Sequence, residues 1–559
     1  MAELVTRLYS NFRGADFRGE EINLVRSPDC LNVYKDYKET ESIRTRPALE
    51  SLEKFEDTVY GIFFYTVGDI TRMLVHSGTR LFCVLNGEKT ELCDGLNEMR
   101  SDAFVYNNIW YFKDGKHYLM YDGRDIKDVE GYIPTTSIAR KSKSGGTIYE
   151  DVNMLSDYRM NTFLADGESR LYYLDAMNID EDFAPVVKVD GKEVFDFVVD
   201  YDNGWITFTT APPKPLTDGQ DNIVVKYKKT VDGYRDKILK CTLLQVFDNR
   251  VFFSGNKDYP NTIFHCSLND PSYCSDLDYY TEGLDSAMVK GLVAGNNVLW
   301  VFKEPSQANT TVFYHVPTID SEYGKIYPST HSSVSTGCVG KAINFNDDIV
   351  FFSERGMEGI NGDITTEQVV AHRSSLVDRK LTAEEDYRDM ILEEWDGYLV
   401  VIIGNKAYLA DSRAMVAIEN HNEYEWFYWD LGEKITCAKV KDGILYLGTK
   451  NGVYTLTDTE GNVESYWVTP KDKAQNANKL KTTNKRGCVA EATGDVTLYA
   501  KTEKTDFEYI GTFNNVTDYF VGRIKRKKFK DIQLKFQSSS RFSLETVTLE
   551  FFIGGYVKR

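Results

Sequence analysis

Histidine is rare in this 559-residue sequence, and no common catalytic motif contains it. The seven histidines include no pair at i and i+4 and no HExxH, which argues against metal catalysis through histidine. A GxSxG nucleophile turn, a P-loop, a GxGxxG that opens a helix and the spacing of an EF-hand are also absent. The sequence therefore predicts a protein that is not an enzyme and that has neither a cofactor nor a bound metal.

Paired cysteines and long apolar runs are missing as well. The nine cysteines are odd in number and never spaced as CxxC, which argues against a disulfide framework and a structural zinc site. No stretch approaches the 18 apolar residues of a membrane span. The N-terminal sequence MAELVTRLYSNFRG lacks the apolar core of a signal peptide, so we expect synthesis in a cytoplasm without export.

Aromatic residues, by contrast, are abundant and recur in short apolar strings. With 36 Tyr and 31 Phe and few helical stretches, the composition favours sheets and predicts a mostly β protein. Seven strings stand out: IFFYTV (62–67), IWYF (109–112), VFFS (251–254), VLWVF (298–302), IVFFS (349–353), LVVII (399–403) and ILYLG (444–448). Six of them follow Asn or Asp turns, at 107–108, 248–249, 296–297, 347–348, 396–397 and 442–443.

The spacing of these strings is nearly constant. Their first residues lie 47, 142, 47, 51, 50 and 45 positions apart. A four-stranded propeller blade uses roughly 40–50 residues, so the spacing predicts a β-propeller of six or seven blades. The long interval is one blade plus about 95 residues, which indicates an inserted domain.

Five parts are expected along the chain. They are an extended N-terminal arm (1–55), a first part of the propeller (56–134), an inserted β-sandwich domain (135–236), a second part of the propeller (237–460) and a basic C-terminal β-domain (461–559). Asp190-Gly191 and Asn203-Gly204 are strong hairpin signals within the insertion. A capping box at Thr382 and Glu385 predicts one helix, over EEDYRDMILEE.

The N-terminal segment has dense mixed charge and little apolar periodicity. We expect it to become ordered only in an assembly, lying along a neighbouring subunit or an adjacent protein. Leu31, Val33 and Tyr34 are expected to anchor it, with Arg26 and Arg46 pairing to nearby acidic groups.

Charge is distributed unevenly. Residues 463–559 contain 18 basic and 11 acidic residues, a net charge of +7. Because the whole chain carries −19, the first 462 residues carry −26. The strongest basic run comprises Arg523, Lys525, Arg526, Lys527, Lys528 and Lys530. It is interpreted first as a docking surface for an acidic protein, with a lysine-protected edge strand and phosphate binding as alternatives.

The two ends of the chain resemble a known family. Arg26-Ser27-Pro28, Asn32 and Arg46-Pro47 lie in a string, FRGADF…RSPDCLNVYKDY…SIRTRPALE, that resembles the start of tail-hub (packaged-DNA stabilisation) proteins of short-tailed bacteriophages and, more distantly, of phage nozzle proteins. Ala48 stands where that family usually has Gly. The ending KKFKDIQLKF…TLEFFIGGYVKR is similar to the C-terminal β-domain of such proteins from phages of gut bacteria.

The resemblance implies a structural protein of the virion tail, made in the cytoplasm of the bacterial host. It further implies a homo-hexameric ring below the portal and adaptor, a channel through which double-stranded DNA leaves without sequence-specific binding, and no membrane partner. Two alternatives stay open: a virion propeller that binds or hydrolyses host-surface glycans, and a cellular propeller scaffold. A carboxylate pair for glycoside hydrolysis is defined in space, and a sequence with 85 acidic residues cannot reveal it.

Overall fold

The protein is mostly β. The computed structural model describes residues 3–19, 22–37, 42–143, 145–307, 310–321, 324–361, 368–418, 421–458, 462–473, 478–525 and 528–556. It divides into two compact units, one comprising Met1–Phe64, Thr71–Thr90 and Ser332–Arg559 and the other Tyr65–Ile70 and Glu91–His331. Helices in the described residues are limited to α1 (Tyr234–Leu239), α2 (Asp378–Leu381) and a 3₁₀ turn, η1 (Tyr387–Asp389).

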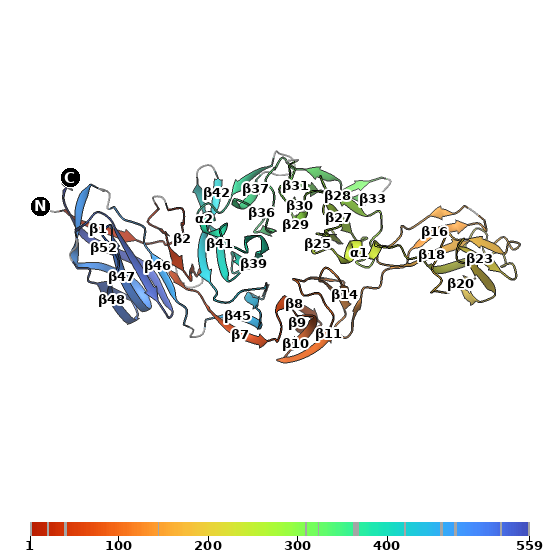
Figure 1. The fold of residues 1–559 in the computed structure, drawn as a ribbon, viewed down its shortest axis with the longest axis horizontal. Coiled ribbons are helices and arrows are strands. Elements are labelled where there is room, and N and C mark those ends of the chain that lie inside the picture. Colours follow the sequence, from red (N-terminus) through yellow and green to blue (C-terminus); the bar gives the residue numbers. More distant parts are fainter. Residues whose placement is uncertain are drawn as a thin grey trace. The chain divides into compact units, whose positions relative to one another are not determined.

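Three four-stranded antiparallel sheets lie in the second unit (Figure 1). Consecutive sheets share apolar cores, and the first strands contact one another: β12 touches β25, and β25 touches β29. The strands are β12 (Asp102–Tyr106), β13 (Ile109–Lys113), β14 (Tyr118–Tyr121) and β15 (Ile126–Asp128); β25 (Leu243–Phe247), β26 (Arg250–Ser254), β27 (Thr262–His265) and β28 (Tyr279–Thr281); and β29 (Val289–Gly295), β30 (Val298–Lys303), β31 (Val312–His315) and β34 (Ser329–His331). A small hairpin, β32 (Thr318–Asp320) with β33 (Gly324–Ile326), precedes β34.

Four further four-stranded sheets belong wholly or mostly to the first unit. Their strands are β8 (Val59–Val67), β9 (Ile70–Ser77), β10 (Arg80–Leu85) and β11 (Glu88–Cys93); β35 (Ala342–Phe345), β36 (Asp348–Ser353), β37 (Gly356–Asn361) and β38 (Val369–His372); β39 (Ile391–Trp395), β40 (Tyr398–Ile403), β41 (Lys406–Ile418) and β42 (His421–Asp430); and β43 (Cys437–Lys441), β44 (Ile444–Gly448), β45 (Gly452–Thr457) and β7 (Ala48–Lys54). The last sheet takes its fourth strand, β7, from the N-terminal part of the chain.

Turn chemistry explains why these sheets repeat. Positive φ occurs at both residues of 107–108, 248–249, 296–297, 346–347, 396–397 and 442–443, as type I′ turns between antiparallel strands require. The turn expected at 347–348 therefore lies one residue earlier, since Asp348 already belongs to β36. Within the insertion, Asp190-Gly191 has this geometry, whereas only Gly204 of Asn203-Gly204 has positive φ.

The apolar strings occupy the strands of these sheets. Six of the seven lie in the second strand of their sheet, but IFFYTV lies in β8, a first strand. Second strands tend to end on a polar side chain that closes the neighbouring turn or loop. Examples are Ser254 Oγ, which donates to the carbonyl of Thr262, and Ser353 Oγ, which donates to that of Gly356. At the end of β13, the ammonium of Lys113 donates to the carbonyls of Ile238 and Leu239.

Residues 135–228 form two further sheets in the second unit. One contains β17 (Thr147–Ile148), β16 (Thr135–Arg140), β18 (Tyr158–Phe163), β24 (Ile223–Lys228), β20 (Val186–Val189) and β21 (Lys192–Val194); the other contains β19 (Leu171–Tyr173), β23 (Trp205–Phe208) and β22 (Phe197–Asp200). They share a core of their own that includes Tyr172, Ile206 and Tyr227. Met154 and Leu155, however, belong to the core beneath β13 and β26, so part of the insertion anchors it to the repeated sheets.

The C-terminal region forms an eleven-stranded sheet that also contains strands from the N-terminus (Figure 1). Its main path runs β4 (Cys30–Leu31), β46 (Ser465–Val468), β51 (Ile532–Ser538), β47 (Lys479–Thr502), β52 (Phe542–Tyr556), β6 (Ile43–Thr45), β5 (Val33–Lys35); β1 (Glu3–Tyr9) pairs with β52, and β48 (Thr505–Val516), β49 (Tyr519–Gly522) and β50 (Lys528–Phe529) pair with β47. Because β4 and β5 are separated only by Asn32, the sheet nearly closes on itself. A short parallel pair, β2 (Gly14–Ala15) with β3 (Arg26–Ser27), lies between β1 and β4 in the chain.

Two expectations differ from the structure. The N-terminal segment was expected to be an extended arm, but its described residues supply five strands to the large sheet and to the sheet of β43–β45. Its buried side chains include Tyr9, Phe12, Val33 and Tyr34, so it has enough apolar residues to pack within its own chain. The prediction of a helix after Thr382 is wrong, because residues 382–394 contain one 3₁₀ turn, η1, followed by β39.

Candidate functional site

The RSP–Asn–RP residues of the N-terminal segment form a polar junction inside the first unit. Ser27 Oγ donates to the carbonyl of Val468 at 2.7 Å, which ties the segment to β46. Asn32 has a φ of 55°, a left-handed conformation that asparagine tolerates better than most residues. Its Nδ2 donates to the carbonyl of Glu464, and its Oδ1 accepts from the amide of Asp430 at the end of β42. We call Arg26, Ser27, Asn32 and Arg46 the N-terminal junction.

Arg26 forms a buried bidentate ion pair in this junction. Its Nε and Nη2 lie 3.0 and 2.7 Å from the two carboxylate oxygens of Glu425 on β42. Burial alone would lower the pKa of Arg26, but the hydrogen bonds to Glu425 and the negative charges of Glu425 and Asp16 together outweigh it and raise the pKa. The more exposed Arg13 approaches the same carboxylate at 3.8 Å. Arg26 therefore pairs with an acidic group, as expected, but the group belongs to the same chain.

Arg46 donates its hydrogen bonds to neutral oxygen atoms. It donates to Asn32 Oδ1 at 2.9 Å and to the backbone carbonyls of Pro47 and Asp430, each at 2.8 Å. Burial lowers the pKa of Arg46 to about 10, although Asp430 acts in the opposite direction. The expected pairing of Arg46 with a carboxylate is replaced by a set of neutral acceptors.

The expected apolar anchors pack close to the junction. Val33 and Tyr34 are buried, and Leu31 is half-buried. The ring of Tyr34 meets that of Trp429 edge-on at 5.5 Å, and Trp429 Nε1 donates to the carbonyl of Val33. These side chains anchor the segment to its own chain, and their role in contacts with another subunit stays a prediction.

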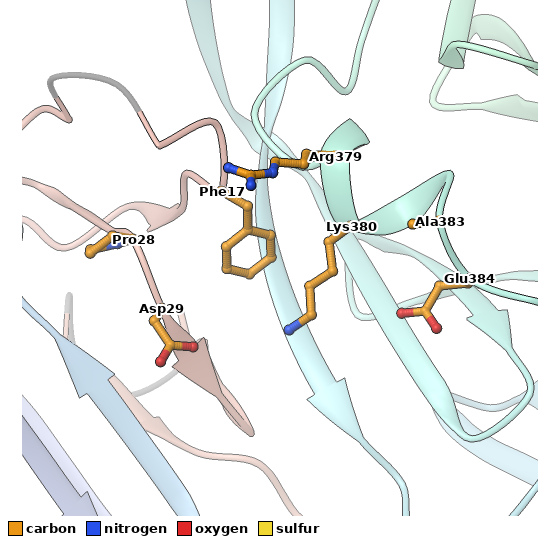
Figure 2. Close-up of a pocket in the computed structure, with 7 residues that line it drawn as sticks. All are labelled: Phe17, Pro28, Asp29, Arg379, Lys380, Ala383 and Glu384. Atoms are coloured by element: carbon orange, nitrogen blue, oxygen red, sulfur yellow. The ribbon is translucent and has the colours of Figure 1, made fainter.

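A cavity of about 480 Å³ lies beside this segment (Figure 2). Phe17, Pro28 and Asp29 line it from the N-terminal side, and Arg379, Lys380, Ala383 and Glu384 line it from α2 and the loop that follows. The ammonium of Lys380 lies 3.4 Å from the ring centre of Tyr428 and 4.9 Å from that of Phe17. Burial lowers the pKa of Lys380. Cation–π contacts with two rings make this lysine a packing element between α2 and the N-terminal segment.

A second polar cluster surrounds His372 at the end of β38. Its Nδ1 lies 3.2 Å from Glu358, and its Nε2 bonds to Asp378 at 2.5 Å. Burial would lower the pKa of His372, but the two carboxylates raise it to about 10. Ser374 Oγ donates to Asp378 rather than to the imidazole. The cluster thus holds an imidazolium between two carboxylates and has no serine–histidine relay. Sequence reasoning missed it because Glu358, His372 and Asp378 share no motif spacing.

Six exposed cations gather on the C-terminal sheet. Lys485 and Arg486 lie where β47 shifts register against β52, and Arg523, Lys525, Lys528 and Lys530 lie on the segment that leads from β49 through β50. The two segments touch, because Thr483 Oγ1 donates to the carbonyls of Ile524 and Lys525, and Lys481 pairs with Phe529. We call these six residues the cationic surface. Arg526 and Lys527 of the basic run lie outside the described residues.

Cysteine and metal chemistry offers no further candidate. The nine cysteines are free thiols, eight of them buried, and burial raises the pKa of Cys30, Cys241 and Cys266 to about 12. In the described part of the chain, no group of three or more His, Cys, Asp or Glu residues is arranged to hold a metal ion. A search of the same residues finds no helix with the length and hydropathy needed to cross a membrane.

Comparison with known proteins gives no family. No family model matches the chain, and no curated protein matches it. Similar solved structures include BamB from Moraxella catarrhalis (TM-score 0.34, 10% identity, covering 73% of this chain and 97% of that one). Others are an exo-β-1,3-galactanase from Phanerochaete chrysosporium (0.23, 10%, 56% and 94%) and the extracellular domain of the putative one-component system BT4673 from B. thetaiotaomicron (0.24, 9%, 92% and 79%). Likenesses with TM-scores this low carry no argument about fold or function.

Proposed function

We propose that the protein is a structural subunit of a bacteriophage tail, a hub or nozzle protein that helps to retain packaged DNA and forms part of the channel for its ejection. The observation that carries the proposal is the N-terminal junction. The residues on which the resemblance to tail-hub proteins rests, Arg26, Ser27, Asn32 and Arg46, bond to β42, β46 and one another. These residues join the N-terminal segment to two sheets of this chain, and a structural role for the motif supports the proposal.

The repeated sheets support a propeller within this proposal. Seven four-stranded antiparallel sheets are found in the described residues, and β7 completes the last one. A final blade that combines strands from both ends of the repeat is how a ring of blades closes without exposed edges. We therefore propose a seven-bladed propeller, the upper of the two expected blade counts.

Charge fits a channel protein. The acidic first 462 residues would repel DNA phosphates, so duplex DNA could slide past them rather than bind. Identical subunits joined through unlike faces can close into a ring when the rotation between neighbours allows. The proposed partners are other copies of the chain, a portal or adaptor protein and other tail proteins.

Localisation of the protein in virions tests the proposal. Particles of the phage that encodes the chain should contain several copies of the protein in the tail, seen by immunogold labelling and by mass spectrometry of purified tails. Images of the purified protein should show rings. Absence of the protein from mature particles would refute the tail function.

The alternative, a virion propeller that binds or hydrolyses glycans, has one observation in its favour. The outer face of the sheet β19-β23-β22 carries stacked rings of Tyr173 and Trp205, 4.9 Å apart and half-exposed, and such rings can pack against sugars. Binding to host-surface glycans in an array that is lost when Trp205 is changed to Ala would favour this alternative.

A further inference from the structure

The cationic surface is held in shape by its own fold. Exposed Arg523, Lys525, Lys528 and Lys530 alternate with Ile524 and Phe529, which are 3% and 0% exposed. The buried side chains and the bonds from Thr483 hold the backbone at Ile524, Lys525 and Phe529. Gly487 fits closely here, because a Cβ at this position would lie 2.7 Å from the carbonyl oxygen of Gly522. The six charges are therefore presented by an ordered surface.

These charges have no carboxylate partner among the described residues. No ion pair within 4.0 Å involves the side chain of any of the six. Two acidic side chains near the surface bond to other groups than the six cationic side chains: Glu503 accepts from the backbone amide of Lys530, and Glu550 accepts from Asn484 Nδ2 at 2.6 Å. A monomer thus leaves these six like charges without an ion-pair partner among the described residues, and their mutual repulsion disfavours the isolated state.

We propose that the cationic surface binds an acidic face of a second copy of this chain. The inference rests on the proposed ring and names its contact. The chain itself supplies the complementary charge, because its first 462 residues carry −26 and the C-terminal 97 residues carry +7. Opposite charges on unlike faces of one chain give a head-to-tail contact, which closes into a ring when the rotation between neighbours allows.

Nucleic acid is the less favoured partner. Phe529, the aromatic residue within the basic segment, is fully buried and presents no ring for base stacking. Duplex DNA requires no stacking, but DNA bound tightly in its channel could not slide, and the proposed function needs it to leave. DNA binding is therefore made an outcome of the test.

Charge reversal tests the contact. The variant Arg523→Glu, Lys525→Glu, Lys528→Glu is compared with wild type and with a matched control, Lys188→Glu, Lys192→Glu, Lys214→Glu, which changes three exposed lysines of the inserted domain by the same total charge. Self-association is measured by sedimentation velocity at low and high salt, and circular dichroism checks folding. Wild type and control should associate, more weakly at high salt, and the test variant should raise the apparent dissociation constant more than about tenfold.

Three results would overturn the proposal. They are a wild-type protein that stays monomeric at every concentration, a test variant that associates as wild type does, and a variant that associates normally but loses binding to duplex DNA. The outcome is separable from that of the tail function. A charge-dependent oligomer of a protein that is absent from virions supports this contact and refutes the tail function, whereas a virion ring unaffected by the variant refutes this contact alone.

Discussion

At the scale of single residues, the N-terminal junction depends on the ion pair of Arg26 and Glu425. The side chain of Glu425 is fully buried and that of Arg26 is 8% exposed, so each needs the other to offset its loss of water. The sequence indicates that Arg26 has an acidic partner, but it cannot identify Glu425, which lies 399 positions away and enters the site only through the fold of β42.

Removal of one partner should be costly. Arg26→Met leaves the Glu425 carboxylate without its bidentate partner, and we expect a loss of about 3–5 kcal/mol in the free energy of unfolding of the first unit. Urea denaturation followed by tryptophan fluorescence measures it, because Trp426 and Trp429 are buried on the same strand.

Two controls define this result. Arg80→Met, which removes exposed ion pairs with Glu56 and Asp57, should cost less than about 1 kcal/mol. The double variant Arg26→Met, Glu425→Met should recover much of the loss, since no buried charge is left unpaired. A double variant as unstable as the sum of the two single variants would contradict the role of the ion pair.

His372 gives the first unit a dependence on pH. The imidazolium between Glu358 and Asp378 has a pKa raised from 6.5 to about 10, so its stabilising effect is complete below about pH 6.5 and is lost as the pH rises through about 10. We expect His372→Gln to lower the free energy of unfolding by about 1–3 kcal/mol at pH 6, and the gap to wild type to shrink toward pH 10. Urea denaturation across this range measures the gap. A gap that stays constant with pH would show that packing, not charge, accounts for the role of His372.

At the scale of elements, local chemistry explains which predictions succeeded. Asn and Asp turns with positive φ precede six of the strings, and that geometry depends on two adjacent residues, so the sequence reveals it. The string IFFYTV (62–67) lies in β8, the first strand of its sheet, and Gly68-Asp69 forms the turn that joins β8 to β9. An apolar string alone does not show which strand of a sheet it forms.

Elements that depend on distant partners were not predictable. Capping chemistry at Thr382 and Glu385 favours a helix, but Ile391–Trp395 pairs with Tyr398–Ile403, so sheet pairing overrides the local preference. The strands β4, β5 and β6 are two or three residues long and carry almost no periodicity. They become strands because β46 pairs with β4, β52 pairs with β6, and β6 in turn pairs with β5.

At the scale of the whole molecule, the two ends of the chain depend on each other. β7 pairs with β45, β1 with β52, and β4 with β46, so residues near the N-terminus pair with residues 398 to 550 positions later. The first unit therefore cannot complete these sheets until nearly the whole chain is available. No local sequence pattern reveals this pairing between the two ends of the chain. For that reason the sequence predicts an extended arm rather than a set of strands.

Truncation at either end should consequently produce the same defect. Deletion of residues 3–35 removes β1, β4 and β5, exposes the edges of β52 and β46, and leaves the aromatic core around Trp429 and Trp467 without Phe12 and Tyr34. Deletion of residues 463–559 removes β52 and β46, the partners of β1 and β4, and the carbonyl of Val468 that accepts from the junction residue Ser27. It also removes the strand to which β6, the partner of β5, is paired.

We expect both truncated proteins to aggregate or to be digested rapidly by protease. Removal of residues 528–556 alone should already release β1, since β1 pairs with β52, while the contacts of Arg26 and Asn32 with β42 remain. Size-exclusion chromatography and limited proteolysis measure the outcome, with cleavage within the N-terminal segment as the sign of release. A protein without residues 3–35 that stays monomeric, soluble and as resistant to protease as the full chain would show that the segment is an independent arm after all. In that case its contacts with β42 and β46 contribute little to folding, and its task would have to be sought in the assembled ring.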